Sequence, residues 1–244
     1  MRTAELVPSS RSVAVSLAVA VLFLLVYFVA RESSLFAVRS VRVEGVRPPV
    51  ARRIEAALRP LEGQNLFKVR GGEVARLATS LPYVSGATYD RAFPHTLRVR
   101  VELEQPLAVL RQGGLAWLVS RRGRVMARIA PRTRRTTPRI WLGQSVDVTL
   151  GETLGPGSGA DEVGMLDMLR GARLASLVGS VHDVEGQWVY ALRSGVELRV
   201  GTRDDLPLKL AIARRILSQT AVSRYLDVSV PERPVAGQES QLSG

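Results

Sequence analysis

The longest apolar segment of the chain runs from Ser12 to Ala30 and contains nineteen residues without a charge, between Arg11 and Arg31. A helix of that length spans about 28 Å at 1.5 Å per residue, close to the ~30 Å hydrocarbon thickness of a bilayer. A cleaved signal peptide is the alternative, but the apolar core exceeds the usual ~7–15 residues and no good small-x-small cleavage site follows it. The pattern therefore predicts a single uncleaved transmembrane helix over Ser12 to Ala30. Arginines on both flanks leave its orientation open.

Residues 36–106 show the pattern of a small mixed unit. Apolar residues alternate with arginine ahead of Gly45, which predicts a short strand. A helix with apolar residues at helical spacing follows Pro48, and a second one runs from about Gly72 to Pro82, where proline stops it.

The clearest strand runs from Thr96 to Glu104, where leucine and valine alternate with arginine and glutamate. A strict period of two is typical of a strand with one face on a core and the other in water. The preceding segment, Val84 to Arg91, is separated from it by the turn sequence Ala92-Phe93-Pro94-His95, so the two predict a hairpin. The order β-α-α-β-β therefore predicts a three-stranded sheet with two helices packed on one face.

Beyond Pro106 the pattern changes to short strands. They are predicted over Leu115 to Ser120, Arg124 to Ile129, Arg139 to Leu142, Val181 to Val184, Trp188 to Leu192, Val196 to Val200 and Tyr225 to Val230. Apolar spacing predicts helices over Val163 to Val178 and Asp205 to Gln219, the second with Asp204 as its N-cap. Residues 231–244 are polar and rich in Pro, Gly, Ser and Gln, which predicts a disordered tail. The fold class is α+β: a transmembrane helix, a β-α-α-β-β domain, and a mainly antiparallel β domain with two helices.

The net charge of +12, from 34 Lys and Arg against 22 Asp and Glu, is concentrated in one segment. Nine arginines and no acidic residue lie between Gln105 and Val146, and five carboxylates follow between Asp147 and Asp167. Arginine beside Trp117 and Trp141 is a pattern that can stack on nucleic-acid bases. Both tryptophans lie in apolar, strand-like runs, however, and are predicted to pack in a core. We expect no nucleic-acid partner, and a basic-patch binder of nucleic acid or another polyanion is kept as an alternative.

The chain has no cysteine and two histidines, which excludes disulfides, thiolate metal sites and cysteine nucleophiles. It contains no P-loop, Gly-x-Ser-x-Gly or His-Glu-x-x-His motif. His95 lies in a turn and His182 opens a short strand, so each is interpreted as structural or solvated. The sequence predicts a protein that is not an enzyme, with no catalytic residue, metal site or cofactor.

Five short motifs in a fixed order carry a resemblance to a known family. Phe36 to Gly45 is similar to an entry strand, Gly63 to Phe67 to an inter-helix turn, Leu118 to Val125 to a hairpin, and Tyr225 to Pro231 to a closing strand. The fifth is similar to an LPWV…R-x-WP-x-TL signature, through Pro82, Tyr83, Val84, Arg91, Phe93, Pro94 and Leu97, and Pro106 ends that unit. Together the motifs resemble the FtsQ/DivIB family of bacterial cell-division proteins over nearly the whole chain.

The resemblance implies a single-pass protein of the cell membrane. Its parts would be a cytoplasmic tail (1–11), a transmembrane helix (12–30), an extracytoplasmic POTRA domain (35–106), a β domain (107–230) and a disordered tail (231–244). It also implies a divisome scaffold at the septum that binds partners of the FtsB/DivIC and FtsL type and links them to septal peptidoglycan synthesis. Self-association through the POTRA domain is expected, and another POTRA-containing envelope assembly protein is the alternative.

The resemblance further indicates the segment from Tyr225 to Val230 as a partner-binding edge strand. An edge strand offers unpaired N–H and C=O groups with which an incoming chain can pair. The segment precedes the polar tail, which fits an edge without a successor strand. Its candidate residues are Tyr225, Leu226, Asp227, Val228, Ser229 and Val230. The alternative is an interior strand that is paired within its own sheet.

Overall fold

The computed structural model describes residues 10–32, 34–133, 136–219, 222 and 224–237, and its contacts divide the chain into two compact units. The N-terminal unit comprises residues 1–102 and the C-terminal unit residues 103–244. Residues 1–9 of the predicted cytoplasmic tail, residues 238–244 of the predicted disordered tail, and Arg134 and Arg135 of the basic segment lie outside the described residues.

The first helix, α1 (Ser10–Glu32), includes the apolar segment from Ser12 to Ala30, and a 3-10 turn, η1 (Ser34–Phe36), follows it. Large apolar side chains along α1 are exposed, among them Leu17 and Phe23. Within the described part of the chain, no helix combines the length and the hydropathy of a membrane span. The transmembrane helix therefore stays a prediction.

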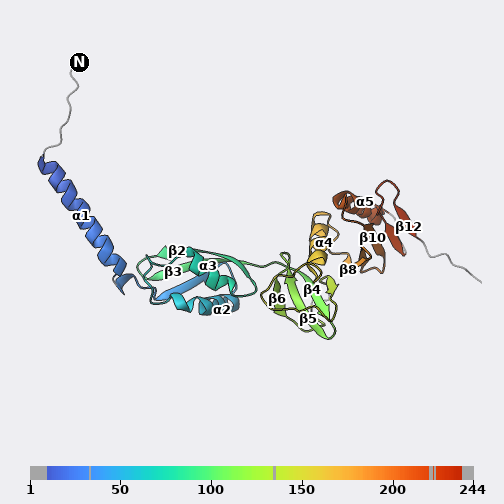
Figure 1. Ribbon diagram of the computed structural model, residues 1–244, viewed down its shortest axis with the longest axis horizontal. Helices are drawn as coiled ribbons and strands as arrows, with labels where there is room; N and C mark the ends of the chain where they lie inside the picture. The colour runs from blue at the N-terminus through green and yellow to red at the C-terminus, as the bar shows by residue number, and fades with distance from the viewer. Residues whose placement is uncertain (1–9, 33, 134–135, 220–221, 223, 238–244) are drawn as a thin grey trace, which may run out of the picture. The chain divides into compact units, whose positions relative to one another are not determined.

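The N-terminal unit contains a three-stranded sheet in the order β1-β3-β2, in which β1 and β3 are parallel (Figure 1). In chain order its elements are β1 (Ser40–Glu44), α2 (Pro48–Leu58), η2 (Arg59–Leu61), α3 (Gly71–Thr79), β2 (Val84–Ala92) and β3 (Thr96–Leu103). The predicted β-α-α-β-β order is confirmed, and the two consecutive strands β2 and β3 are neighbours, as the hairpin required.

Local sequence explains where α2 begins and where α3 ends. Pro48 opens α2, where a missing N–H costs nothing because the first N–H groups of a helix have no intrahelical acceptor. At the end of α3, the hydroxyl of Thr79 bonds to the carbonyl of Ala75 and the hydroxyl of Ser80 to that of Leu77. The helix therefore stops before Pro82, as predicted.

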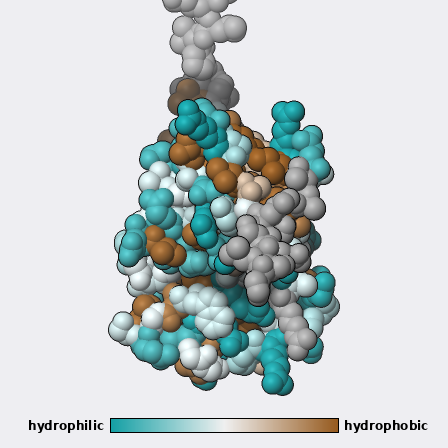
Figure 2. All heavy atoms as spheres, turned by 90° about the vertical axis from the view of Figure 1, so that its right-hand side faces the viewer, coloured by the Kyte–Doolittle hydropathy of each residue, from teal (hydrophilic) through white to brown (hydrophobic). Residues whose placement is uncertain are grey.

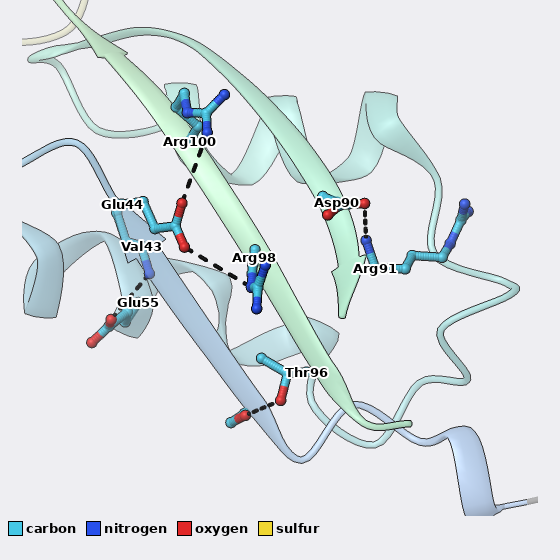
Figure 3. Close-up of polar contacts among 9 residues, drawn as sticks. Val43, Glu44, Glu55, Asp90, Arg91, Thr96, Arg98 and Arg100 are labelled. Carbon is cyan, nitrogen blue, oxygen red and sulfur yellow. Dashed lines mark hydrogen bonds and ion pairs between the residues drawn. The ribbon is translucent and has the colours of Figure 1, made fainter. Parts of the chain in front are cut away.

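β3 separates the core of the N-terminal unit from its solvent face. Leu97 and Val99 are fully buried and belong to one apolar cluster with residues of both helices. On the opposite face, Glu44 of β1 lies 4.0 Å from Arg98 and 3.9 Å from Arg100 (Figure 3). Exposed ion pairs contribute only about 0–1 kcal/mol each, so the apolar face holds this unit together.

The C-terminal unit contains a nine-stranded sheet in the order β12-β11-β10-β9-β8-β7-β4-β5-β6 within the described residues. In chain order its elements are β4 (Pro106–Gln112), β5 (Leu115–Ser120), β6 (Val125–Arg128), β7 (Arg139–Trp141), α4 (Ala160–Gly171), β8 (Val178–Val184), β9 (Gln187–Leu192), β10 (Glu197–Gly201), α5 (Leu206–Gln219), β11 (Tyr225–Asp227) and β12 (Val235–Gly237). The pairs β4–β7, β7–β8 and β10–β11 are parallel and the other neighbours are antiparallel. The prediction of an α+β protein with a β-rich second domain is confirmed.

Leu174 marks the largest difference between a predicted and an observed helix. Spacing assigns it to a helix over 163–178, but α4 ends at Gly171. Arg173 adopts φ 58°, and the N–H of Leu174 bonds to the carbonyl of Leu169, a pattern that closes the C-terminus of a helix. Leu174 is nevertheless buried, with 1% of its surface exposed, because the turn directs it into the core. Its spacing from the buried residues of α4 is therefore the same as that of a helical core residue.

β4 and β12 are strands that the sequence pattern does not predict. Four consecutive residues of β4, Leu107 to Leu110, are buried, so this strand has no polar alternation. β12 lies inside the segment 231–244, and the prediction of disorder is wrong for Val235–Gly237. Three residues without an apolar alternation give no strand signal, and only pairing with β11 defines them.

Candidate partner-binding edge

β10, β11 and β12 form one end of the nine-stranded sheet (Figure 1). β10 and β11 are parallel, with Glu197 opposite Tyr225. Parallel neighbours cannot be joined by a tight turn, and α5 supplies the crossover connection while it buries Leu206 and Leu210 in the core of the unit. Leu206 and Leu210 of α5 and Leu226 of β11 belong to the same apolar cluster, so the crossover helix and the strand share one core.

Two of the six predicted strand residues hold β11 to the core. Leu226 and Val228 are both 0% exposed and belong to the main apolar cluster of the C-terminal unit. The N–H of Val228 donates to the carbonyl of Arg199 on β10 at 2.9 Å. These two side chains face the protein and are closed to a partner.

The remaining predicted residues end the strand. β11 covers only Tyr225–Asp227, because the Asp227 carboxylate accepts hydrogen bonds from the N–H and the hydroxyl of Ser229, at 2.8 and 2.6 Å. Such a local side-chain bond competes with the strand ladder and turns the chain. Val230 follows the turn and is 52% exposed.

β11 is not the edge of its sheet in this structure. β12 pairs with it in antiparallel orientation, from Tyr225 opposite Gly237 to Asp227 opposite Val235. The prediction of an edge strand without a successor is therefore wrong, and within the described residues the outermost position belongs to β12. The interior reading of the segment fits the observed pairing.

Tyr225 shapes the contact between β11 and β12. A Cβ at position 237 would overlap Cε1 and Cδ1 of the Tyr225 ring, so the ring lies directly against the glycine. The guanidinium carbon of Arg199 is 4.6 Å from the centroid of the same ring. An aromatic side chain across from a glycine is a known way to stabilise a pair of strands. The tail therefore carries its glycine where the ring needs the space.

The charges beside β11 are paired. Arg199 donates to Glu197 at 2.8 Å. This hydrogen bond is the main cause that lowers the pKa of Glu197, and it raises the pKa of Arg199. On the face shown in Figure 2, brown apolar groups are interspersed with teal hydrophilic ones.

Most of the predicted family motif packs inside the N-terminal unit. Val84 and Leu97 are fully buried. Tyr83 packs against the same core, and burial raises the pKa of its hydroxyl, which has no hydrogen-bond partner among the described residues. Pro82 follows α3, and Pro106 is the first residue of β4. These positions form the fold and do not gather at a common site.

Arg91 is a structural residue of the motif. Its Nε donates to the carbonyl of Leu66 at 2.7 Å, and its Nη2 donates to the carbonyl of Val69 and the hydroxyl of Tyr89, at 3.1 and 3.0 Å. Leu66 and Val69 lie in the connection between α2 and α3. Arg91 thus fixes that connection against β2, whereas its sequence position alone indicates only a hairpin.

Phe93 belongs to an aromatic cluster that the sequence analysis misses. The ring of Phe93 is 5.9 Å from Phe36 and 5.3 Å from Phe67, and Phe67 is 6.2 Å from Tyr27 of α1. Phe93 is 54% exposed, and the Phe93-Pro94 peptide bond is cis. The sequence does not predict this cluster, since its four rings come from separate segments of the chain.

Two arginines of the basic segment make contacts within the C-terminal unit. Arg121 forms a two-bond pair with Asp167 of α4, at 2.6 and 3.0 Å. Arg124 donates to the carbonyl of Gly151 at 2.9 Å. Both arginines connect the hairpin of β5 and β6 to later parts of the chain, so this charge serves the fold.

Trp117 and Trp141 have different environments. Trp117 is buried, as predicted, but Trp141 is 61% exposed, and its prediction as a core residue is wrong. β7 is only three residues long, and the alternation that buries Ile140 directs Trp141 to the other face. The Arg111 guanidinium lies 5.5 Å from the Trp141 ring.

The described residues hold no group of three or more His, Asp or Glu side chains that could bind a metal ion. His95 accepts hydrogen bonds through its backbone carbonyl from the N–H groups of Arg39 and Ser40, at 2.9 and 3.4 Å. It thereby joins β1 to the turn before β3, which fits the structural interpretation of this residue.

Two models of protein domain families match this chain, one in each unit. Residues 36–102 match the POTRA domain of FtsQ type, and residues 108–229 match the C-terminal domain of the cell division protein FtsQ/DivIB. A POTRA domain followed by this β-rich domain defines a class of bacterial cell-division proteins that is not a known enzyme family. The chain belongs to the FtsQ/DivIB family.

Curated relatives carry the same name. The cell division protein FtsQ of Thiomonas arsenitoxydans is 28% identical over 180 residues, which cover 69% of this chain and 60% of the relative. That of Bordetella pertussis is 45% identical over 56 residues, which cover 23% of this chain and 20% of the relative. The matched parts therefore span less than two thirds of either relative.

Proposed function

We propose that this chain is a bitopic membrane scaffold of the bacterial divisome. Its N-terminus is cytoplasmic, and the two domains that follow the membrane span, residues 35–106 and 107–230, are extracytoplasmic at the division septum. The C-terminal unit binds partners of the FtsB/DivIC and FtsL type and links them to septal peptidoglycan synthesis. The N-terminal unit adds a surface for self-association. Family membership supports the role in cell division.

The observation that carries the partner-binding part is the end of the large sheet. There β11 is held in place by β10 and the core, and its outer side is covered by only three residues, Val235–Gly237. Strand ladders give affinity through backbone bonds, and side chains such as Tyr225 give register. A partner strand that pairs with β12, the outermost strand of the described sheet, would extend the sheet without any change to its core.

The membrane anchor is supported by the charge-free segment from Ser12 to Ala30 and by the ring contacts next to it. The ring of Tyr27, near one end of that segment, lies 6.2 Å from that of Phe67, and aromatic rings favour the interface between lipid and water. We expect the full chain to stay in the membrane fraction after alkaline extraction. The mass of the mature protein then separates an anchor from a signal peptide, because cleavage near Ala30 would remove the segment.

Photo-crosslinking in membranes tests the partner site. Leu226 and Val228 are buried, so the photo-reactive residue p-benzoylphenylalanine is placed at Val230 or Val235, each 52% exposed. Leu208 on α5 is also 52% exposed and serves as the matched control. We expect a short single-span protein to be captured at Val230 and Val235 and far less at Leu208. Absence of capture at both strand positions, or equal capture at all three, would contradict the proposed site.

A polyanion-binding surface is a second candidate function, and the exposure of Trp141 favours it. Trp141 lines an open hollow of about 330 Å³ with Pro131, Arg111, Arg132 and Arg139. An exposed aromatic ring among arginines can stack and pair with an anionic polymer. Binding isotherms of the full chain with single-stranded DNA at several salt concentrations test this. Equal affinity of the Trp141→Ala variant would dismiss the candidate.

A further inference from the structure

Three aromatic rings form a cluster outside the core of the N-terminal unit. The ring of Phe36 lies 5.2 Å from that of Phe67 and 5.9 Å from that of Phe93, and the rings of Phe67 and Phe93 are 5.3 Å apart. Phe93 is exposed, and among the described residues the apolar core of this unit includes none of the three rings. This aromatic cluster therefore carries apolar surface that the fold itself does not bury completely.

The backbone holds the aromatic cluster in place. The N–H of Leu66, next to Phe67, donates to the carbonyl of Phe36 at 2.8 Å. Arg91, two residues before Phe93, donates through its Nε to the carbonyl of the same leucine at 2.7 Å. The three segments that supply the rings are thus joined to one another. Because the rings are already ordered, a surface that covers them pays little entropy to fix them.

The aromatic cluster lies close to the segment that is predicted to cross the membrane. Three residues separate the end of α1 at Glu32 from Phe36, and a step of four extended residues reaches at most about 14 Å. The ring of Tyr27, inside the charge-free segment, lies 6.2 Å from that of Phe67. A bilayer that contains this segment therefore has its surface within reach of the rings.

The side chains beside the rings match a membrane surface that contains anionic lipids. Lys68 follows Phe67, and the N–H of Arg39 donates to the carbonyl of His95, in the turn that contains Phe93. Both cationic side chains are exposed. Aromatic rings concentrate at the level of lipid headgroups, and lysine or arginine near the surface is attracted to anionic headgroups. Cations beside exposed rings therefore match both chemical features of such an interface.

An open hollow beside the rings gives room for a lipid headgroup. It has a volume of about 400 Å³ and is lined by Phe67, Tyr89, Asp90, Arg91 and Phe93. The Asp90 carboxylate accepts a hydrogen bond from the N–H of Arg91 at 2.8 Å (Figure 3). The lining thus carries one carboxylate and one guanidinium group, and a zwitterionic headgroup can pair with both charges.

We propose that the aromatic cluster docks the N-terminal unit on the surface of the bilayer that holds its membrane anchor. The three rings lie among the lipid headgroups, and Arg39 and Lys68 face anionic lipids. The inference rests on the proposed function, because it needs the anchor. The anchor keeps the cluster near the bilayer at a high effective concentration, so a contact too weak to bind a free domain suffices here. Docking then fixes the orientation of the N-terminal unit on the membrane, which the anchor alone does not determine.

Quenching of tryptophan fluorescence by dibrominated lipid tests the docking, with the full chain reconstituted in vesicles of phosphatidylcholine and phosphatidylglycerol. The native tryptophans all lie in the C-terminal unit, so the wild type supplies the background: Trp117, Trp141 and Trp188. Phe93→Trp keeps an aromatic ring in the cluster. Leu103→Trp is the matched control, since Leu103 is also exposed but lies at the far end of β3, about 23 Å from the first residue of that strand. We expect the tryptophan added at position 93 to be quenched about threefold more than the one at position 103.

A negative charge in the cluster provides the opposite change. Phe67→Trp is the reporter, and Phe93→Glu is added to it, with Leu103→Glu as the control. A carboxylate at position 93 should keep the rings out of an anionic surface, so we expect lipid quenching at position 67 to fall about threefold in this variant and to stay unchanged in the control. Phe93 and Leu103 are both exposed, so the midpoint of urea unfolding should be the same in the two variants. Equal quenching at position 67 in both would overturn the proposal.

Alkaline extraction of the same vesicles separates this inference from the proposed function. If the chain stays in the membrane and the tryptophan at position 93 is quenched no more than the one at position 103, the docking is wrong while the anchor stands. If the chain is released and neither tryptophan is quenched, the anchor fails, and the docking fails with it. Strong quenching at both positions would contradict the cluster as the docking surface. A retained chain with strong quenching at position 93 alone supports both the anchor and the docking.

Discussion

β3 of the N-terminal unit and β12 of the C-terminal unit differ in length, in number of neighbouring strands and in burial. β3 of the N-terminal unit has eight residues, lies between two neighbours, and buries Leu97, Val99 and Val101 on one face. β12 of the C-terminal unit has three residues, one neighbour, and no residue in the core. The comparison shows that β3 is fixed by the apolar side chains it buries, whereas β12 depends on its backbone pairing with β11 and on the Tyr225 ring against Gly237.

The largest expected effect comes from the buried face of β3. Leu97→Ala removes a side chain that is 0% exposed and should destabilise the N-terminal unit by about 2–5 kcal/mol. Because the two units have separate apolar clusters, hydrogen exchange at β11 and β12 should not change. Val235→Ala on β12 is the control and should leave unfolding by urea within about 0.5 kcal/mol of the wild type. A faster exchange of β11 in Leu97→Ala would show that the units are not independent.

The next effect concerns the connection that Arg91 fixes. Arg91→Ala removes three hydrogen bonds and leaves the carbonyls of Leu66 and Val69 without this donor, which should cost about 2–3 kcal/mol. Arg98→Ala, on the solvent face, removes only a 4.0 Å exposed pair and should cost less than about 1 kcal/mol. The midpoint of urea unfolding of the N-terminal unit measures both. Equal losses would mean that Arg91 contributes as a surface charge and not as a brace.

The same contrast explains what the sequence could predict. In β3 and α3, burial imposes a period of two or a helical spacing on the residues themselves, so both elements can be predicted from the chain. β4 could not be predicted because Leu107 to Leu110 are all buried and show no alternation. The end of α4 could not be predicted because the turn at Arg173 directs Leu174 inward at a helical spacing.

The candidate site was predictable only in part. Tyr225 to Val230 could be found because Leu226 and Val228 alternate, and alternation reports burial. That alternation says nothing about the outer side of the strand, where pairing is made by backbone groups that every residue has. β12 therefore left no trace in the sequence, apart from a glycine in a polar tail. Arg91 and Phe93 were found through a motif, but their contacts depend on Leu66 and Phe67, about 25 residues earlier in the chain.

A smaller effect is expected inside the C-terminal unit, at β9. The hydroxyl of Tyr190 is buried, which raises its pKa, and it donates to the carbonyl of Met165 in α4 at 3.0 Å. Tyr190→Phe leaves that carbonyl without this donor and should cost about 1–2 kcal/mol in urea unfolding. Tyr225→Phe keeps the ring against Gly237 and is the control, with a loss below about 0.5 kcal/mol. A loss of stability in Tyr225→Phe as large as that in Tyr190→Phe would mean that the Tyr225 hydroxyl contributes to folding, and would contradict the control.

The smallest effect is a pH dependence at the β10–β11 pair. The hydrogen bond from Arg199 lowers the pKa of Glu197 in the folded state, so its stabilising contribution is complete above the ordinary glutamate value of 4.5 and is lost as the pH falls through the lower folded value. Both side chains are about half exposed, and solvent screening limits the contribution to about 0.2–0.5 kcal/mol. The difference in stability between wild type and Glu197→Gln, measured at pH 7 and at pH 3, should shrink toward zero at the lower pH.

Because Arg199 also lies against the Tyr225 ring, hydrogen exchange of the β12 amides should accelerate slightly relative to that of β3 once Glu197 is protonated. A constant difference across this range would mean that Glu197 has no part in holding the end of the sheet, and that the Tyr225–Gly237 contact acts alone.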